Sequence, residues 1–172
     1  CGIFLDKVAR DAGEATQTIE VRKSVSLDQV REELAHHASL GFAHQTEQRG
    51  TGHALNQALP GIPDDHQILV LFGDVPLVTT ASLRALLEQA PPDGVALLTA
   101  IVEKPKGYGR VLRDDSGAVT AIVEDKDATP AQRAIKEINT GLMVLPGGAI
   151  SRWVEAVRDD NVQGEFYLTD VI

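Results

Sequence analysis

The strongest strand pattern in the chain covers residues 67–72, a continuous apolar run that ends in Gly73-Asp74. A run of this length is typical of a strand buried on both faces of a parallel sheet. Before it, apolar residues recur alternately at helical and at strand spacing. This spacing predicts a helix at 4–12, a strand at 18–22, a helix beginning at Ser26, a strand at 40–43 and a helix at 53–59.

After residue 72 the alternation continues and then changes character. The pattern predicts a helix capped by Thr80, a strand at 95–102, a hairpin turn at 114–117, strands at 119–124 and 137–145, and a helix through Ile150, Val154 and Val157. Alternating helices and strands followed by a hairpin-rich section predict an α/β fold. Its sheet is expected to be mixed but mostly parallel, flanked by helices, with some antiparallel additions.

The chain has no internal repeat or linker, so residues 1–172 are expected to form a single domain. The sequence begins with Cys1 rather than Met and ends inside an apolar periodic segment. We therefore expect a partial domain that is truncated at both ends.

Composition narrows the class of protein. The formal net charge of −9 argues against partners such as nucleic acid or an anionic membrane surface. A single cysteine, Cys1, excludes an internal disulfide, and no apolar run reaches the length of a membrane span. A cytoplasmic enzyme or binding domain is the expected class.

Asp74 is the first candidate for chemistry, because the carboxyl ends of strands in open α/β sheets face ligands. Mg²⁺ prefers one or two carboxylates together with water and phosphate oxygens, so a strand-end aspartate fits a nucleotide enzyme. The alternative is that Asp74 caps a turn before Pro76. From this position alone, the two interpretations are equally well supported.

A second candidate is the loop that precedes the helix expected at 53–59. It contains Gly50-Thr51-Gly52, and unpaired N–H groups at the start of a helix can meet an anion or a base edge. The pattern is not GxGxxG, and a tight loop with unusual backbone angles is the alternative.

Six short motifs then occur in one order. They are Gly50-Thr51-Gly52-His53-Ala54 within residues 45–54, Gly73-Asp74-Val75-Pro76-Leu77, Gly107-Tyr108-Gly109-Arg110, residues 122–129, Glu137-Ile138-Asn139-Thr140-Gly141, and residues 163–170. Together they closely resemble the uridylyltransferase domain of the bacterial N-acetylglucosamine-1-phosphate uridylyltransferase/glucosamine-1-phosphate acetyltransferase family. The resemblance covers residues 45–172, whereas residues 1–44 match only in their pattern of elements.

The resemblance implies a Rossmann-like nucleotidyltransferase fold that uses Mg²⁺. The implied reaction joins UTP and N-acetylglucosamine 1-phosphate, and releases UDP-N-acetylglucosamine and pyrophosphate. The product would supply synthesis of peptidoglycan and lipopolysaccharide. The resemblance also implies a homotrimeric parent protein, assembled through an acetyltransferase domain that this chain lacks.

Site residues carried over from the family fall into four groups. The resemblance implies that the uracil is contacted by Gln45, Gly50 and Thr51. It implies that the nucleotide is lined by Phe72 and Gly73, beside Asp74 as the metal ligand. It implies that the N-acetylglucosamine is held by Gly109, Glu124 and Asn139, and that Tyr167 and Thr169 lie near the sugar phosphate. Taken alone, Glu124 is better explained as an exposed strand end and Asn139 as a turn former beside Thr140-Gly141, because Asn, Thr and Gly are common turn residues. A carboxylate and a side-chain amide nevertheless suit sugar hydroxyls.

The chain also departs from the family. Its sequence contains neither the glycine-rich loop and following lysine with which family members begin nor their second metal ligand, an asparagine. We therefore expect this chain to be catalytically weak or inactive by itself. Two rival hypotheses are a transferase for another sugar 1-phosphate or nucleotide, and a non-catalytic module that binds sugar nucleotides.

Overall fold

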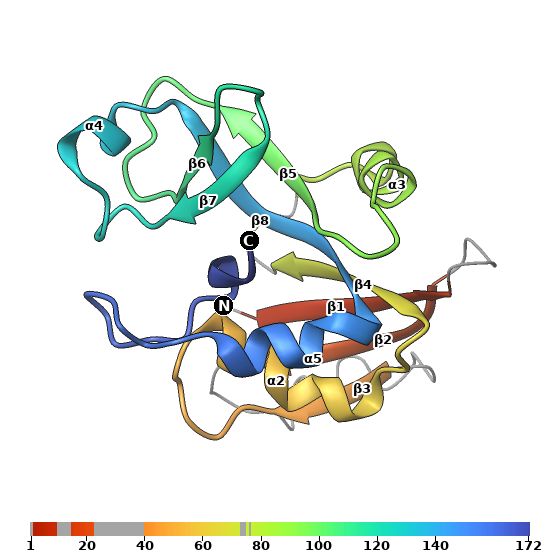
Figure 1. The fold of residues 1–172 in the computed structure, drawn as a ribbon. Coiled ribbons are helices and arrows are strands. Elements are labelled where there is room, and N and C mark those ends of the chain that lie inside the picture. Colours follow the sequence, from red (N-terminus) through yellow and green to blue (C-terminus); the bar gives the residue numbers. More distant parts are fainter. Residues whose placement is uncertain (1, 10–14, 23–39, 73–74, 76) are drawn as a thin grey trace.

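The computed structural model describes residues 2–9, 15–22, 40–72, 75 and 77–172. Its described strands form one eight-stranded mixed sheet (Figure 1). The elements in chain order are β1 (Gly2–Ala9), β2 (Ala15–Arg22), β3 (Leu40–His44), α2 (Thr51–Ala58), η1 (Leu59–Gly61), β4 (His66–Phe72), α3 (Thr80–Glu88), β5 (Ala96–Ile101), β6 (Arg110–Arg113), β7 (Val119–Val123), α4 (Pro130–Arg133), β8 (Glu137–Pro146), α5 (Gly147–Ala156) and η2 (Leu168–Val171).

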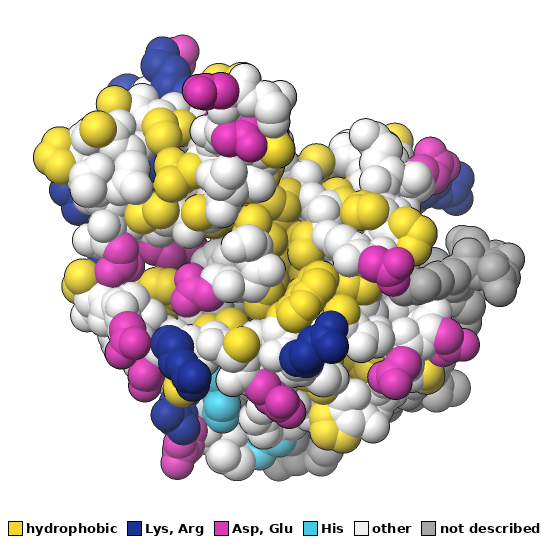
Figure 2. All heavy atoms as spheres, in the orientation of Figure 1, with side chains coloured by type: hydrophobic (Ala, Val, Ile, Leu, Met, Phe, Trp, Pro, Cys, Tyr) yellow, Lys and Arg dark blue, Asp and Glu magenta, His cyan; other side chains and the backbone are white. Residues whose placement is uncertain are grey.

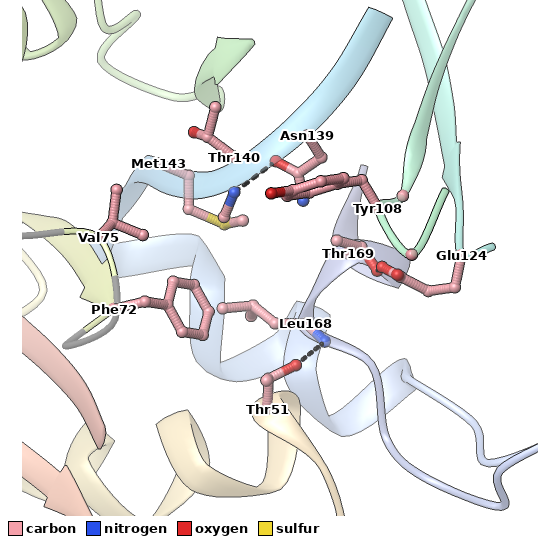
Figure 3. A pocket seen from close by; sticks show the side chains of 13 residues that line it. Thr51, Phe72, Val75, Tyr108, Glu124, Asn139, Thr140, Met143, Leu168 and Thr169 are labelled. Atoms are coloured by element: carbon pink, nitrogen blue, oxygen red, sulfur yellow. Dashed lines mark hydrogen bonds between the residues drawn. The ribbon is translucent and has the colours of Figure 1, made fainter. Parts of the chain in front are cut away.

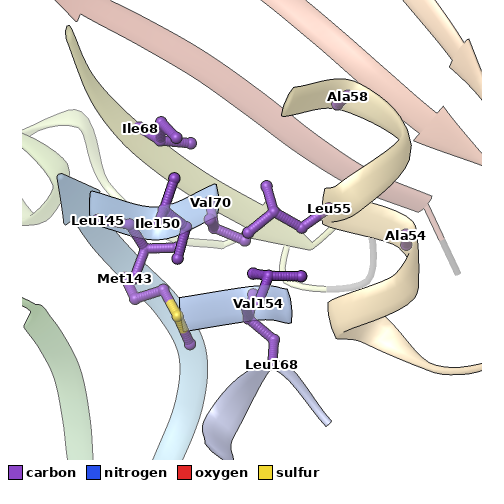
Figure 4. Packing of buried hydrophobic residues seen from close by; sticks show 10 residues of the cluster. All are labelled: Ala54, Leu55, Ala58, Ile68, Val70, Met143, Leu145, Ile150, Val154 and Leu168. Atoms are coloured by element: carbon purple, nitrogen blue, oxygen red, sulfur yellow. The ribbon is translucent and has the colours of Figure 1, made fainter. Parts of the chain in front are cut away.

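Helices cover both faces of the sheet, and the sheet divides the core into two clusters. On one face, α2 and α5 pack against β4 and β8 (Figure 4), in a cluster made of Ala54, Leu55, Ala58, Ile68, Val70, Met143, Leu145, Ile150, Val154 and Leu168. On the other face, Leu86 of α3 packs against Leu69 and Val144. Because successive β4 side chains point to opposite faces and both faces are covered, the apolar run is continuous.

The expected mostly parallel sheet is wrong for the described strands. β2 and β3 run parallel, and every other pairing among them is antiparallel. The continuous apolar run of β4 reports burial on both faces, and helices achieve that burial whatever the direction of the neighbouring strands. The α/β class is confirmed, whereas strand direction was not encoded in the pattern.

The helix expected at 4–12 is also wrong, because residues 2–9 form strand β1. Ile3 pairs with Phe72, and the register continues to Ala9 opposite His66. Apolar residues at 4, 5, 8 and 9 fit a helix period, but Ile, Phe and Val also favour strands, and pairing with β4 decides between them.

Most of the other expected elements are confirmed within about two residues, which is the usual uncertainty of element ends. The cap of α3 is Thr79 rather than Thr80, since its side chain accepts the N–H of Ser82 at 3.1 Å. The helix expected from Ser26 lies outside the described residues. No helix in the described part of the chain is long and apolar enough to cross a membrane.

β8 is the strand that joins the two parts of the sheet. Its residues from Met143 to Pro146 pair with β4, whereas Ile138 pairs with Arg110 of β6. Between these pairings β8 bulges, because Leu97 and Thr99 of β5 face Met143 and Asn139, respectively. Gly141 makes the bulge possible with a φ of 83°, which other residues adopt at a cost. The pairing of β8 with β4 covers only Met143 to Pro146, and the pocket described next lies beside the residues of β8 that precede it.

Candidate functional site

A pocket of about 330 Å³ lies beside the bulge of β8. In Figure 2 the surface is hollowed between the upper and lower parts of the molecule, with hydrophobic side chains in the hollow. The lining residues are Thr51, Phe72, Val75, Gly107, Tyr108, Gly109, Glu124, Asn139, Thr140, Gly141, Met143, Leu168 and Thr169 (Figure 3). Its volume is at the lower end of the range for small-molecule sites.

One wall of the pocket is polar and built from four segments. The backbone N–H of Asn139 donates to the carbonyl oxygen of Gly109 at 2.9 Å, which ties β8 to the loop before β6. Thr169 Oγ1 donates to Glu124 Oε1 at 3.2 Å, which ties η2 to the end of β7. A Cβ atom at Gly109 would lie 3.1 Å from the same Oε1 atom, so glycine permits this close approach.

This wall leaves hydrogen-bonding groups for a ligand. Asn139 Oδ1 accepts the N–H of Gly141 at 3.0 Å, but among the described residues none accepts from Asn139 Nδ2. Glu124 Oε2 likewise has no hydrogen-bond donor in the described part of the chain. An amide donor and a carboxylate acceptor in one wall suit a ligand with hydroxyl and acylamino groups.

The carboxyl group of Glu124 is electrostatically unusual. Burial raises its pKa above the ordinary value of 4.5, and the nearby charges of Asp127 and Asp170 raise it further. The hydrogen bond from Thr169 and the charge of Arg110 act in the opposite direction without reversing the shift. A half-buried acid with a raised pKa in a pocket is a candidate for ligand recognition.

The opposite wall is mainly apolar and includes Phe72 at the end of β4. The ring of Phe72 lies against Gly141, where a Cβ atom would approach Cε2 to 2.6 Å. Thr51, the first residue of α2, accepts the N–H of Leu168 through Oγ1 at 2.9 Å (Figure 3). The ring supplies a flat surface, and this hydrogen bond joins the start of α2 to the C-terminal segment.

Three of the sequence-predicted residues lie next to the pocket without lining it. Gln45 is buried, and its Nε2 donates to the carbonyl oxygen of Gly50 at 3.1 Å. Gly50 has a φ of 105°, and a Cβ atom there would lie 2.5 Å from the oxygen of Phe166. Tyr167 is buried, and its hydroxyl accepts from Gln163 Nε2 at 2.7 Å. Gln45 and Gly50 therefore shape the loop that presents Thr51.

The structure therefore brings together six of the predicted residues, Thr51, Phe72, Gly109, Glu124, Asn139 and Thr169. Sequence reasoning assigned no site role to the remaining lining residues. Four of these residues belong to the sequence motifs that contain Gly109 and Asn139, namely Gly107, Tyr108, Thr140 and Gly141. Membership in these motifs is the signal by which they could be predicted as pocket residues. Met143 belongs both to the hydrophobic core and to the pocket lining.

The comparison with known families decides the classification. Residues 9–172 match the family model described as Nucleotidyl transferase. The chain belongs to the nucleotidyl transferase family. Curated relatives agree. The chain is 55% identical over 145 residues to the bifunctional protein GlmU of Pseudomonas aeruginosa (strain LESB58), covering 84% of the chain and 32% of that protein.

Two further relatives of this nucleotidyl transferase chain carry the same name. The identity is 57% over 128 residues with the protein of Alkalilimnicola ehrlichii, covering 74% of the chain and 27% of that protein. It is 51% over 156 residues with the protein of Azotobacter vinelandii, covering 91% and 34%, respectively. The chain thus spans about a third of the length of the curated relatives it matches.

The expected metal ligand of this nucleotidyl transferase, Asp74, and the neighbouring Gly73 lie outside the described residues. The flanking residues Phe72 and Val75 both line the pocket. The part of the chain that is described contains no group of three or more His, Cys, Asp or Glu side chains able to hold a metal ion. A metal ion held by one carboxylate and substrate oxygens needs no such group.

Proposed function

We propose that this chain forms the substrate-binding part of a uridylyltransferase that joins UTP to N-acetylglucosamine 1-phosphate. In this reaction a phosphate oxygen of the sugar 1-phosphate forms a bond to the α-phosphorus of UTP. The bond from that phosphorus to the bridging oxygen breaks, and pyrophosphate leaves with the electron pair. The product is UDP-N-acetylglucosamine.

The observation that carries the proposal is the pairing of two different walls in one pocket. The amide of Asn139 and the carboxylate of Glu124 suit the acetamido and hydroxyl groups of the sugar. The ring of Phe72 and the start of α2 lie across the pocket, where a nucleotide would find an apolar surface and the N-terminus of a helix. A sugar nucleotide has this same division between a polyhydroxylated and an aromatic end.

The residues of the chain would act by positioning. Glu124 would accept a sugar hydroxyl, Asn139 would donate to the acetamido oxygen, and the N–H of Gly109 would bind a further oxygen. Thr51 would orient the nucleotide, supported by Gln45 and Gly50 behind it. Holding two substrates in line contributes much of the rate in phosphoryl transfer, and a protein nucleophile is not needed.

Magnesium belongs to this proposal through Asp74, the residue proposed to hold it. When bound, the ion would compensate negative charge on the phosphate oxygens. Tyr167 and Thr169 would lie toward the sugar phosphate, where Thr169 also holds Glu124 in place.

The wider context is part of the same proposal. The relatives are named bifunctional, and the chain spans about a third of their length. We propose a Rossmann-like nucleotidyltransferase core, a cytoplasmic setting and a homotrimeric parent whose second activity resides outside this chain. By itself, the chain is expected to bind ligand but to be a weak catalyst or inactive.

A thermal-shift titration with UDP-N-acetylglucosamine and Mg²⁺ tests the proposal, because a ligand that binds only the folded state raises its melting temperature. UDP-glucose is the matched ligand control, since it lacks the acetamido group. We expect a larger rise with UDP-N-acetylglucosamine, and loss of that difference in Asn139→Ala. Equal shifts with both ligands would favour another sugar, and no shift with either would overturn the proposal.

A further inference from the structure

Arg110 is the most unusual buried residue in the described part of the molecule. The residue is only 1% exposed, although its guanidinium group carries a permanent charge. Its Nη2 donates to Asp125 Oδ1 at 2.9 Å and to the carbonyl oxygen of Arg133 at 3.5 Å. Its Nη1 donates to the carbonyl oxygen of Tyr108. The guanidinium group therefore joins the loop before β6 to the segment after β7 and to the last residue of α4.

Asp125 completes the connection to the same loop. Burial alone would raise its pKa, but the backbone N–H of Gly107 and the guanidinium of Arg110 together hold the pKa below its ordinary value of 3.8. Asp125 therefore stays ionised and contacts both ends of Gly107-Tyr108-Gly109-Arg110. Each partner of the ion pair is also adjacent in sequence to a residue of the polar pocket wall, Arg110 to Gly109 and Asp125 to Glu124.

Stability does not explain why this arginine is buried. Its Nε atom is buried with no hydrogen-bond partner among the described residues. An unsatisfied buried donor is unfavourable, and buried ion pairs are often no more stabilising than apolar side chains of similar volume. Apolar residues in place of both members of the pair would fill the space without leaving a donor unpaired. Arg110 does offer a planar group that can fix several acceptors at set directions, which an apolar side chain cannot do.

We propose that Arg110 is a positioning residue whose ion pair with Asp125 holds Gly109 and Glu124 at the spacing needed to bind the N-acetylhexosamine half of the ligand. This inference rests on the proposed function for the identity of the ligand. Its basis is geometric. Gly109 and Glu124 approach each other so closely that a Cβ atom at position 109 would be 3.1 Å from Glu124 Oε1. Small displacements at such a contact change the pocket directly.

The test compares two ligands in the full chain. Isothermal titration with UDP-N-acetylglucosamine and with UMP should show that Asp125→Asn and Arg110→Met weaken binding of the sugar nucleotide by about tenfold relative to UMP. A variant that is only less stable changes both affinities together. Asp125→Asn keeps the size of the side chain and remains informative if Arg110→Met fails to fold.

Arg113→Met is the matched control. Arg113 lies on the same strand and forms an ion pair with Glu137, with Nη2 2.6 Å from Oε1, but it lies outside the pocket lining. This variant should leave the ratio of the two affinities unchanged. If it lowers the ratio as much as Asp125→Asn does, or if Asp125→Asn leaves the ratio unchanged, the inference is overturned.

Hydrogen exchange separates this inference from the proposed function. The amide of Asn139, which donates to Gly109, and the amide of Gly107 should exchange at least about tenfold faster in Asp125→Asn than in the parent chain. This readout needs no ligand. If the parent chain binds neither ligand but the two amides become unprotected, the proposed function fails while positioning of the loop stands. Unchanged exchange at both amides would overturn the positioning role.

Discussion

The ring of Phe72 lies directly against the backbone of Gly141, so that a Cβ atom at position 141 would stand 2.6 Å from Phe72 Cε2. Phe72 ends β4, and Gly141 lies in the bulge of β8, so this contact joins two strands where their pairing has stopped. Both residues line the candidate pocket.

Gly141→Ala should therefore reduce both stability and ligand binding. Alanine at a positive φ costs about 1–2 kcal/mol, and the clash with Phe72 should add about 1–3 kcal/mol. Gly117→Ala is the matched control, because Gly117 has a φ of 85° and nothing within 4 Å of an added Cβ atom. Urea unfolding measures the difference, and equal losses of unfolding free energy would show that Phe72 moves aside freely.

Thr51→Val should loosen the connection between α2 and the C-terminal segment. It leaves the N–H of Leu168 without its acceptor, which costs about 1–3 kcal/mol for a buried group. Thr51→Ser retains an oxygen and should restore most of the unfolding free energy. The exposed Thr120, whose hydroxyl contacts the carbonyl of Leu112 at 3.4 Å, supplies the control Thr120→Val, which should change little. Equal unfolding free energies for Thr51→Val and Thr51→Ser would contradict the role of this hydrogen bond.

Glu124→Gln should raise stability while weakening binding of the sugar nucleotide. Burial, the largest cause, raises the pKa of Glu124 above 4.5 in the folded chain, so ionisation is less favourable there than in the unfolded chain. The stability associated with Glu124 is therefore complete below pH 4.5 and is lost as pH rises through the raised pKa. Thermal unfolding should show that Glu124→Gln stabilises the chain at pH 7 and leaves its stability unchanged near pH 4.

Glu137→Gln is the control with the opposite sign. The hydrogen bond from Arg113 lowers the pKa of Glu137 below 4.5, so its contribution is present above that pH and is lost as pH falls. This variant should therefore destabilise the chain at pH 7, with an effect reduced by solvent because Arg113 is exposed. The same sign for both variants at pH 7 would contradict the electrostatic assignment of Glu124.

Gln45→Ala and Asn139→Ala should affect different ligands. Gln45 supports the loop before α2 through the hydrogen bond that its Nε2 donates to the carbonyl oxygen of Gly50. The same Nε2 atom lies 3.0 Å from His53 Nδ1. Its loss should weaken UMP binding by about tenfold, or about 1.4 kcal/mol, and leave N-acetylglucosamine 1-phosphate binding nearly unchanged. Asn139→Ala should show the reverse in calorimetric titrations. If both variants lose affinity for both ligands to the same extent, the pocket does not have two separate halves for the two ligands.

Much of the candidate site can be predicted from the sequence, because its residues belong to motifs that occur in one order along the chain. Glu124 and Asn139 are ambiguous alone, but the order of their motifs with those of Gly109 and Thr169 predicts that all four residues belong to one site. All four line one pocket. Gln45 and Tyr167 belong to the same motifs but lie beside the pocket, because neighbours along a motif need not share a surface.

The sequence by itself determined the family and most helices and strands from residue 40 onward, because side-chain periodicity and motif order are properties of the chain alone. Only the tertiary structure decided that the described strands pair mainly antiparallel, that residues 2–9 form a strand, and that Arg110 meets Asp125 inside the protein. These features depend on contacts between segments far apart in sequence. Local propensity is too weak to choose among such contacts, and burial and pairing in the folded chain make the choice.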